Sequence, residues 1–375
     1  MGGIYIHIPF CKQRCKYCAF FSTTLHNMQE RYVYAVCNEI KLRHDYIKGP
    51  ADTVYFGGGT PSVLTTEQIT RILEQIKESI GIDDNAEITL EANPDDLSPE
   101  YLLQLRTLGI NRLSMGVQSF NDKQLSLLNR RHSAQKACEA VENARGAGFT
   151  NISIDLMFAL PDSNAKEWRH DLEQAIALRP NHISAYNLTY EEGTVLYKEV
   201  EKGIIYPLSE DDNLAQFKIL INTLKEAGYK HYEISNFALA GYESRHNSSY
   251  WHDVPYLGCG AAAHSYDGHS RGWNIADINA YIEGVESGEP NFKVEHLSPA
   301  EQYNDAILTR LRTTDGVPVD WIRQKFGDRL TDYMLKNAAP HITAGRLKEQ
   351  DRSLVLTREG LFVSDAIMRD LIYIE

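Results

Sequence analysis

The stretch that decides the fold is HIPFCKQRCKYCAF, residues 7–20. It places Cys11, Cys15 and Cys18 in a C-x3-C-x2-C spacing. Cysteine thiolates are the usual ligands of iron–sulfur clusters, and three thiolates this close together can bind three corners of a cubic [4Fe-4S] cluster. No fourth cysteine follows, because the next two positions are Ala19 and Phe20. The spacing therefore predicts a cluster in which one iron is left open to an outside ligand.

An open iron in a reducing cluster can bind a small chelating molecule and transfer one electron to it. This is the chemistry of radical enzymes that use S-adenosylmethionine (SAM). A structural zinc site usually takes four protein ligands, often as two C-x2-C pairs, and no second pair follows here. Buried structural cysteines explain isolated positions but not three within eight residues. The flanking Lys12, Arg14 and Lys16 should favour the thiolate form.

Composition limits the classes of function. The chain has 375 residues and a net charge of −13, which predicts one large domain with a smaller one and argues against a general nucleic-acid binder. No segment is apolar enough to cross a bilayer, and the N-terminus does not read as a signal peptide. With the clustered cysteines needed as thiolates, we expect a reducing cytoplasm, no stable membrane insertion, and Cys37, Cys138 and Cys259 as small core residues.

The first two thirds of the chain alternate short β-rich runs with amphipathic helical runs. The predicted strands are Ile4–Ile8, Thr53–Phe56, Glu87–Glu91, Arg112–Val117, Ile152–Phe158 and His182–Leu188. The first helical run is placed at Met28 to Ile47. Repeated βα units give parallel strands with right-handed crossovers. Six units predict an α/β fold with a partial (β/α)6 barrel; a flat, doubly wound sheet is the alternative that periodicity leaves open.

Three units are predicted along the chain. Residues 1–206 form the partial barrel, residues 207–297 extend it, and residues 298–375 form a smaller α+β module. Helices with a short hairpin near Gly345 and Leu354–Leu356 make the last unit winged-helix-like. Such modules often bind DNA. In this acidic chain we favour packing or partner docking instead.

Polar residues fall repeatedly where the predicted strands end. In a βα barrel the loops after the strands carry the chemistry. The second strand is followed by GGGTP, whose glycines allow close approach of the backbone to a ligand; a phosphate loop is excluded because no Gly-Lys-Ser/Thr follows. Glu91, Gln118, Arg130 and Asp155 follow on later strands and could hold the ammonium, ribose or carboxylate of SAM, although a single strand-end acid is also compatible with simple solvation.

The full set of motifs resembles a known family. YIHIPFC, GGGTPS, EANP, GVQS, NRRH and IDLMFALP occur in this order, and LRTTDG and LTREGLFVSD follow near the C-terminus. This set is similar to the radical SAM family that contains oxygen-independent coproporphyrinogen III oxidases and HemW-type heme chaperones. The resemblance covers the whole chain. The cysteine motif alone specifies only the radical SAM superfamily.

Three features favour the chaperone branch of this family. The oxidases continue the cysteine motif with a further cysteine, where this chain has Phe20. They also carry an N-terminal extension, whereas the first strand predicted here begins almost at Met1. The chaperones carry an HNxxYW motif, which this chain matches at residues 246–251. The resemblance thus implies a carrier that binds heme and delivers it to apo-hemoproteins such as respiratory enzymes. Coproporphyrinogen III oxidation, or another radical SAM reaction, is the alternative.

The resemblance also assigns residues to cofactors. Cys11, Cys15 and Cys18 would hold the cluster. A SAM site would be lined by Tyr5, Tyr17, Gly58, Gly59, Thr60 and Glu91, and a second SAM, known in the oxidases, would contact Gln118, Arg130 and Asp155. The heme site would be formed by His246, Asn247, Tyr250 and Trp251. A monomer or a heme-linked dimer, and transient contact with a membrane, are compatible with this assignment.

The chemistry of the HNSSYW segment agrees with heme but does not require it. Histidine is a usual axial ligand of heme iron, and Tyr250 and Trp251 offer flat surfaces for a porphyrin. The same sequence is also compatible with an ordinary loop histidine beside two aromatic residues of the core. Other candidate ligands are His252 and His264, and the arginines that could meet heme propionates are Arg245 and Arg271.

Overall fold

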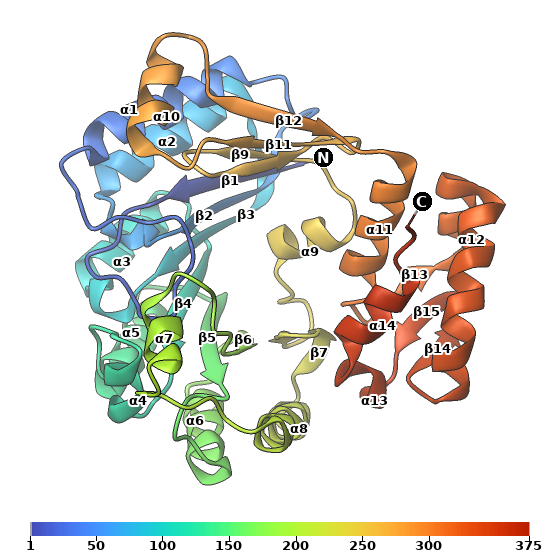
Figure 1. Cartoon of the computed structure of the whole chain (residues 1–375). Coiled ribbons are helices and arrows are strands. Elements are labelled where there is room, and N and C mark those ends of the chain that lie inside the picture. Colours follow the sequence, from blue (N-terminus) through green and yellow to red (C-terminus); the bar gives the residue numbers. More distant parts are fainter. Residues whose placement is uncertain (1, 375) are drawn as a thin grey trace.

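Six parallel strands form the centre of the main sheet in the order in which they occur in the chain (Figure 1). The structure, a computed structural model, describes residues 2–374; Met1 and Glu375, the outer ends of the first and last predicted units, lie outside the described residues. The strands are β1 (Gly3–Ile8), β2 (Ala51–Gly58), β3 (Ile82–Ala92), β4 (Arg112–Gln118), β5 (Ile152–Phe158) and β6 (His182–Asn187). All six predicted strands are therefore present.

The order of the strands decides between the two predicted architectures. Each of β1 to β5 pairs in parallel with the next strand of the chain. A doubly wound sheet would reverse its strand order near the middle. The consecutive order and the curved sheet of Figure 1 confirm the partial (β/α)6 barrel.

Alternation along the strands gives the barrel two different faces. On β1 the side chains of Ile4, Ile6 and Ile8 are fully buried among the outer helices, whereas Tyr5 and His7 point inward. Successive side chains of a strand point to opposite faces of the sheet. The inward side chains of all six strands include tyrosines, carboxylates, serines and histidines. The interior of the barrel, which we call the lumen, is therefore polar.

The helices that follow the strands cover the outside of the barrel. They are α1 (Gln29–Leu42), α2 (Thr66–Ser79), α3 (Pro99–Thr107), α4 (Asp122–Leu127), α5 (Ala134–Gly146), α6 (Ala165–Ala177), α7 (Val195–Glu201) and α8 (Glu210–Glu226). Helices α4, α5 and α6 start directly after Asn121, Ser133 and Asn164, because each of these side chains accepts a hydrogen bond from the first turn. The first helix was predicted too long, since it ends at Leu42 where Arg43 leaves helical geometry.

Short strands that the sequence pattern did not reveal extend the sheet at both edges. β9 (Tyr256–Cys259) pairs in parallel with β1 and continues through β10 (His264–Tyr266) and β11 (Ser270–Asn274) to β12 (Phe292–His296). Beyond β6 lie β8 (Asn236–Ala238) and β7 (Lys230–Glu233). Helix α10 (Ile278–Glu286) packs on α1, and α9 (Arg245–Trp251) lies in the middle of the molecule (Figure 1).

The C-terminal residues form a separate α+β module with its own apolar core. Its helices are α11 (Pro299–Arg310), α12 (Val319–Thr343), α13 (Arg358–Leu361) and α14 (Ser364–Leu371). Its sheet has the order β13 (Val317–Pro318), β15 (Ser353–Leu356), β14 (Leu347–Gln350). Helices with a small hairpin agree with the predicted winged-helix-like module. Within residues 2–374, none of the helices combines the length and the apolar character that crossing a membrane requires.

Candidate cofactor site in the barrel

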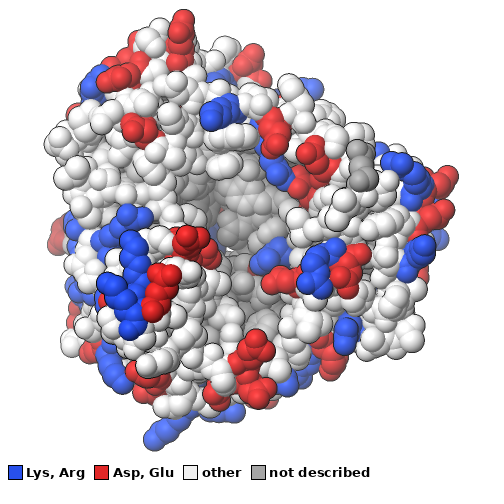
Figure 2. Space-filling view, viewed as in Figure 1, with Lys and Arg blue, Asp and Glu red and all other residues white. Residues whose placement is uncertain are grey.

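A cavity of about 1290 Å3 lies at the carboxyl ends of the parallel strands. Figure 2 shows the molecule hollowed at its centre, between the barrel and the C-terminal module. Eleven of the predicted site residues line this cavity, and they are Cys11, Cys15, Tyr17, Cys18, Gly58, Gly59, Thr60, Glu91, Gln118, Arg130 and Asp155. Tyr5 and the four residues predicted for heme do not line it. The structure thus brings the predicted cluster and SAM residues together and separates them from the heme motif.

The three clustered cysteines are free thiols around one end of the cavity. The Thr60 hydroxyl donates to Cys11 Sγ over 3.3 Å, and the Arg130 guanidinium donates to Cys15 Sγ over 3.3 Å. In the described part of the chain, no three His, Cys, Asp or Glu side chains gather closely enough to hold a single metal ion. Cys11, Cys15 and Cys18 all line the same cavity, and cysteine thiolates are the usual ligands of iron–sulfur clusters, so the residues present fit a [4Fe-4S] cluster.

The expected effect of the neighbouring cations on these thiols needs correction. Lys12 pairs with Asp96 at 2.7 Å and Lys16 pairs with Glu199 at 2.7 Å, so both ammonium groups are engaged by carboxylates. Burial raises the pKa of Cys11 and of Cys18. The cation that contacts a sulfur is Arg130, which lies more than a hundred residues away in the sequence. Of the three flanking cations, only Arg14 acts as predicted: it lowers the pKa of Cys18, but by less than burial raises it.

The glycine loop after β2 leaves no room for side chains. Gly58 has a φ of +111°, and a Cβ on it would lie 2.6 Å from the His7 ring. A Cβ on Gly59 would lie 2.8 Å from the Pro9 carbonyl carbon and 3.0 Å from Cys11 Sγ. Only glycine tolerates both the conformation and the close approach. The loop is therefore packed directly against the cysteine loop.

Two inward carboxylates stand at the cavity floor. Glu91 accepts hydrogen bonds from the Tyr55 hydroxyl at 2.7 Å and from the Gly58 N–H at 3.3 Å. Burial raises the pKa of Glu91 to about 7, and burial raises the pKa of Asp155 to about 6. A buried carboxylate with a raised pKa gains from a cationic ligand, because a nearby positive charge favours its ionised form. Both residues are therefore suited to an ammonium or sulfonium group.

Gln118 and Arg130 reach the same cavity by different means. Gln118 has a φ of +68°, next to an irregularity in the pairing of β4 with β5. Non-glycine residues in this region are uncommon and often mark functional sites. The Arg130 guanidinium donates to Asn93 Oδ1 and to the Gly116 carbonyl, each at 2.5 Å, as well as to Cys15. Arg130 therefore already binds the protein with both terminal nitrogens.

The HNSSYW segment forms α9, a single short helix at the other end of the lumen. Its N-cap is Ser244, and the backbone N–H of His246 donates to Glu87 Oε1 at 3.1 Å. The His246 side chain is 1% exposed, with Nδ1 bonded to Thr53 Oγ1 at 2.8 Å and Nε2 bonded to the Tyr250 hydroxyl at 2.8 Å. Burial, with Arg112 as a smaller second cause, lowers the pKa of His246 to about 3. In this conformation the imidazole is neutral and both of its nitrogens are occupied.

The remaining residues of the motif pack around this histidine. The ring of Tyr250 lies 4.6 Å from that of Tyr256, and Trp251 meets Tyr232 edge-on at 5.9 Å. The backbone N–H of Asn247 donates to Ser244 Oγ at 3.3 Å. Tyr5 and Tyr55 stack on the His246 ring at 6.4 Å and 4.9 Å. Because Tyr55 also bonds Glu91, these aromatic rings connect the heme motif with the cofactor cavity.

The alternative heme contacts are arranged differently. His264 is exposed and stacks on Trp273 at 6.1 Å, whereas His252 bonds the Ser248 carbonyl at 2.7 Å and Asp315 at 3.2 Å. Of the two arginines, Arg245 donates to the Asn85 carbonyl at 2.6 Å and Arg271 pairs with Asp305. His264 is thus the more accessible of the two alternative histidines.

The C-terminal module holds the far end of α9 in place. Helix α11 packs beside α9 (Figure 1). Asp253, just after α9, pairs with Lys325 of α12, and Arg310 donates to the His252 carbonyl at 3.4 Å. These contacts restrain the residues that directly follow α9.

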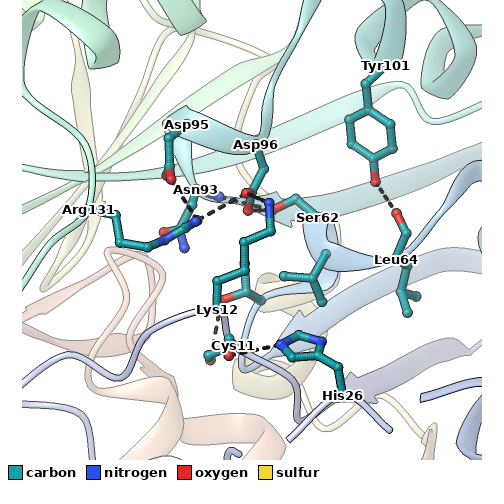
Figure 3. Close-up of polar contacts among 12 residues, drawn as sticks. Cys11, Lys12, His26, Ser62, Leu64, Asn93, Asp95, Asp96, Tyr101 and Arg131 are labelled. Carbon is teal, nitrogen blue, oxygen red and sulfur yellow. Dashed lines mark hydrogen bonds and ion pairs between the residues drawn. The ribbon is translucent and has the colours of Figure 1, made fainter. Parts of the chain in front are cut away.

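Sequence reasoning missed several residues of the site. Asp96 contacts Lys12, Ser62 and Arg131 at the edge of the cysteine loop (Figure 3). Arg112 is 1% exposed in the lumen, and its Nε and Nη1 have no hydrogen-bond partner among the described residues. Asp96 could have been noticed from its place just after EANP. Nothing local marks Arg112, which starts an ordinary strand.

Comparison with known proteins places this site in a class. Residues 5–175 match the Radical SAM superfamily, and residues 297–363 match the HemN C-terminal domain. The solved structure of Escherichia coli coproporphyrinogen III oxidase (HemN), described as a radical SAM enzyme, superimposes with a TM-score of 0.84 at 23% identity, over 99% of this chain and 89% of that chain. This likeness shows that the two chains share their fold.

Full-length relatives define the family more narrowly. The heme chaperone HemW of Bacillus subtilis is 35% identical over 98% of this chain and 98% of its own length. The mouse mitochondrial radical S-adenosyl methionine domain-containing protein 1 is 32% identical over 99% of this chain and 87% of its own length. The chain belongs to the HemW family of radical SAM proteins, as its motifs predicted.

Proposed function

We propose that this protein is a heme chaperone that binds heme and delivers it to apo-hemoproteins in the cytoplasm. The observation that carries the proposal is its 35% identity to a heme chaperone across nearly the whole of both chains. Respiratory enzymes are the acceptors that we favour, and we expect a monomer or a heme-linked dimer. The acidic chain supports the expectation that nucleic acid is not a partner.

The cavity residues are assigned to a [4Fe-4S] cluster and SAM. Cys11, Cys15 and Cys18 would hold the cluster, and the backbone of the glycine loop and Glu91 would receive the amino-acid part of SAM. When bound, this pair supplies one-electron chemistry at the open iron. The Arg130 guanidinium already donates to Cys15 Sγ before any cofactor arrives, and so helps to hold that side chain at the cavity wall. Tyr5 lies outside the cavity and would act through His7, which its hydroxyl contacts at 3.0 Å.

His246 is proposed as the heme ligand in an opened state of α9. In the closed state both imidazole nitrogens are occupied and the side chain is buried, so heme iron cannot reach them. An outward rotation of α9 would free both ring nitrogens, and an exposed imidazole, with an ordinary pKa of about 6.5, is mostly neutral at neutral pH and can ligate iron. Tyr250 and Trp251 would move with it and offer aromatic surface for the porphyrin.

Hemin titration of wild type and His246→Ala tests the heme site. The Soret absorbance should report weaker binding by the variant, while its iron–sulfur absorbance after anaerobic reconstitution stays unchanged. His264→Ala is the matched control, because His264 is exposed and lies outside the motif. Equal hemin affinity of wild type and His246→Ala would reject His246 as the ligand, and a loss in His264→Ala alone would transfer the role to that residue.

Coproporphyrinogen III oxidation remains the second candidate because of the size of the cavity. Its volume of about 1290 Å3 exceeds that of a typical single-ligand pocket and leaves room for a tetrapyrrole beside a cluster and SAM. Anaerobic incubation of reconstituted protein with coproporphyrinogen III, SAM and dithionite separates the two functions. We expect no protoporphyrinogen, and its formation would put the oxidase first.

A further inference from the structure

Four loops meet at the carboxyl ends of the first four strands. The loops after β1 and β2 carry the cysteines and the glycines, and the loops after β3 and β4 carry Asn93 and Arg130. A ligand held by the open iron and by the glycine loop bridges two separate loops. Its affinity therefore depends on the distance between them, because binding pays for any reorganisation needed to bring its contacts together.

One carboxylate, Asp96, joins its own loop after β3 to the other three loops (Figure 3). Asp96, in the short turn after β3, accepts a hydrogen bond from Lys12 at 2.7 Å, next to the cluster ligand Cys11. It accepts another from Ser62 at 2.8 Å, just beyond the glycine loop, and a third from Arg131 at 3.0 Å. Ser62 in turn accepts from the backbone N–H of Asn93 at 3.2 Å. Asp96 is therefore bonded to the cysteine loop and to the glycine loop at the same time.

Burial of the Asp96 carboxylate strengthens its hydrogen bonds to the two loops. The Asp96 side chain is 1% exposed, whereas the Lys12 side chain that reaches it is 50% exposed. Hydrogen bonds to charged groups contribute more to stability than neutral ones, and solvent screens a buried carboxylate less than an exposed one. The neighbouring Asp95 pairs with the same Arg131 at 2.8 Å but is 20% exposed. Within residues 2–374, Asp95 forms no hydrogen bond or ion pair with Lys12 or Ser62.

We propose that Asp96 is a positioning residue that holds the cysteine loop and the glycine loop at the separation that SAM requires. Asp96 does not touch the cofactor; it acts through Lys12 and Ser62. The inference rests on the proposed function for its cofactor. It adds to that function the group that fixes the mutual placement of the two binding loops before the cofactor arrives.

The test compares Asp96→Asn with Asp95→Asn in the full-length, anaerobically reconstituted protein. Iron and sulfide content and the thermal midpoint establish that each variant is loaded and folded. The SAM-induced change in the electron paramagnetic resonance spectrum of the reduced cluster, titrated with SAM, then gives the affinity. We expect a roughly tenfold weaker affinity for Asp96→Asn, the size of one lost charge-assisted hydrogen bond, and less than about twofold for Asp95→Asn.

A second variant protects the test against misfolding of the first. Lys12→Met removes the Lys12–Asp96 ion pair by changing its more exposed partner. Together with Asp96→Asn it forms a double-mutant cycle, in which the losses of SAM affinity should not add. Asp96→Asn and Asp95→Asn with equal SAM affinity, or Lys12→Met and Asp96→Asn with fully additive losses, would overturn the positioning role. If wild type itself showed no SAM-induced change, the proposed cofactor would be wrong instead.

Discussion

Thr53→Val should increase the affinity of the protein for heme. Thr53 lies on β2, is 1% exposed, and its hydroxyl is the partner of His246 Nδ1 at 2.8 Å. Valine has nearly the same shape but cannot form this hydrogen bond. The variant therefore weakens the closed position of α9 without touching the HNSSYW residues that would meet heme in the open state.

The size of the effect follows from the burial of His246. A buried polar group that loses its partner costs about 1–3 kcal/mol. If heme binds only the open state, the apparent dissociation constant falls by the factor by which that state becomes more populated. A cost of about 1–2 kcal/mol then corresponds to roughly 5–30-fold tighter binding.

Hemin titration of Thr53→Val against wild type and Thr89→Val measures this effect. Thr89 is buried in the same lumen, but its hydroxyl has no hydrogen-bond partner in the part of the chain that is described, so valine there should leave heme affinity unchanged. A Thr53→Val protein that is folded and binds heme no more tightly than Thr89→Val would refute the idea that the closed helix limits heme access.

Two further predictions concern the cluster and the contacts that hold α9. Cys15→Ala should abolish the iron–sulfur absorbance but leave the far-ultraviolet circular dichroism unchanged. The fold should survive because Cys15 lies on the cavity wall and outside the apolar core. A variant that still assembles a full [4Fe-4S] centre would contradict the proposed site of three thiolates. Lys325→Met should raise the rate of hemin binding by up to about fivefold, since a partly exposed ion pair contributes about 0.2–1 kcal/mol. Arg323→Met removes ion pairs of the same helix with Asp320 and Asp328, neither of which follows α9, and should not change that rate; equal rates in both variants would exclude the contact with Asp253 as a restraint.

Much of the barrel could be predicted because its determinants are local. Apolar residues alternate with polar ones along Ile4–Ile8, and similar short apolar runs mark the other strands of the barrel. Capping residues mark the starts of the helices that follow. Parallel strands place all their carboxyl ends on one side. The gathering of Cys11 and Glu91 around one cavity followed from the strand ends, and Asp155, inside β5, was marked by its charge in an apolar run.

The strands at the sheet edges could not be found in the same way. β8 and β10 have three residues each, and β12 consists of alternating charged and apolar residues that are mostly exposed. Such segments become strands because a neighbouring edge supplies backbone partners. At Gly258 a Cβ would lie 1.9 Å from the His264 carbonyl oxygen, so this close pairing is visible only in three dimensions.

The amino-acid sequence by itself determined the barrel, the cysteine loop and the family of this protein, because these depend on periodicity and spacing along short stretches. Only the tertiary structure decided that Lys12 bonds Asp96, that Arg130 reaches Cys15, and that His246 is closed off by Thr53. These pairs are separated by tens to hundreds of residues. Their contacts arise when the strands close around the polar lumen, and no local pattern encodes which distant partner satisfies a buried charge or a buried nitrogen.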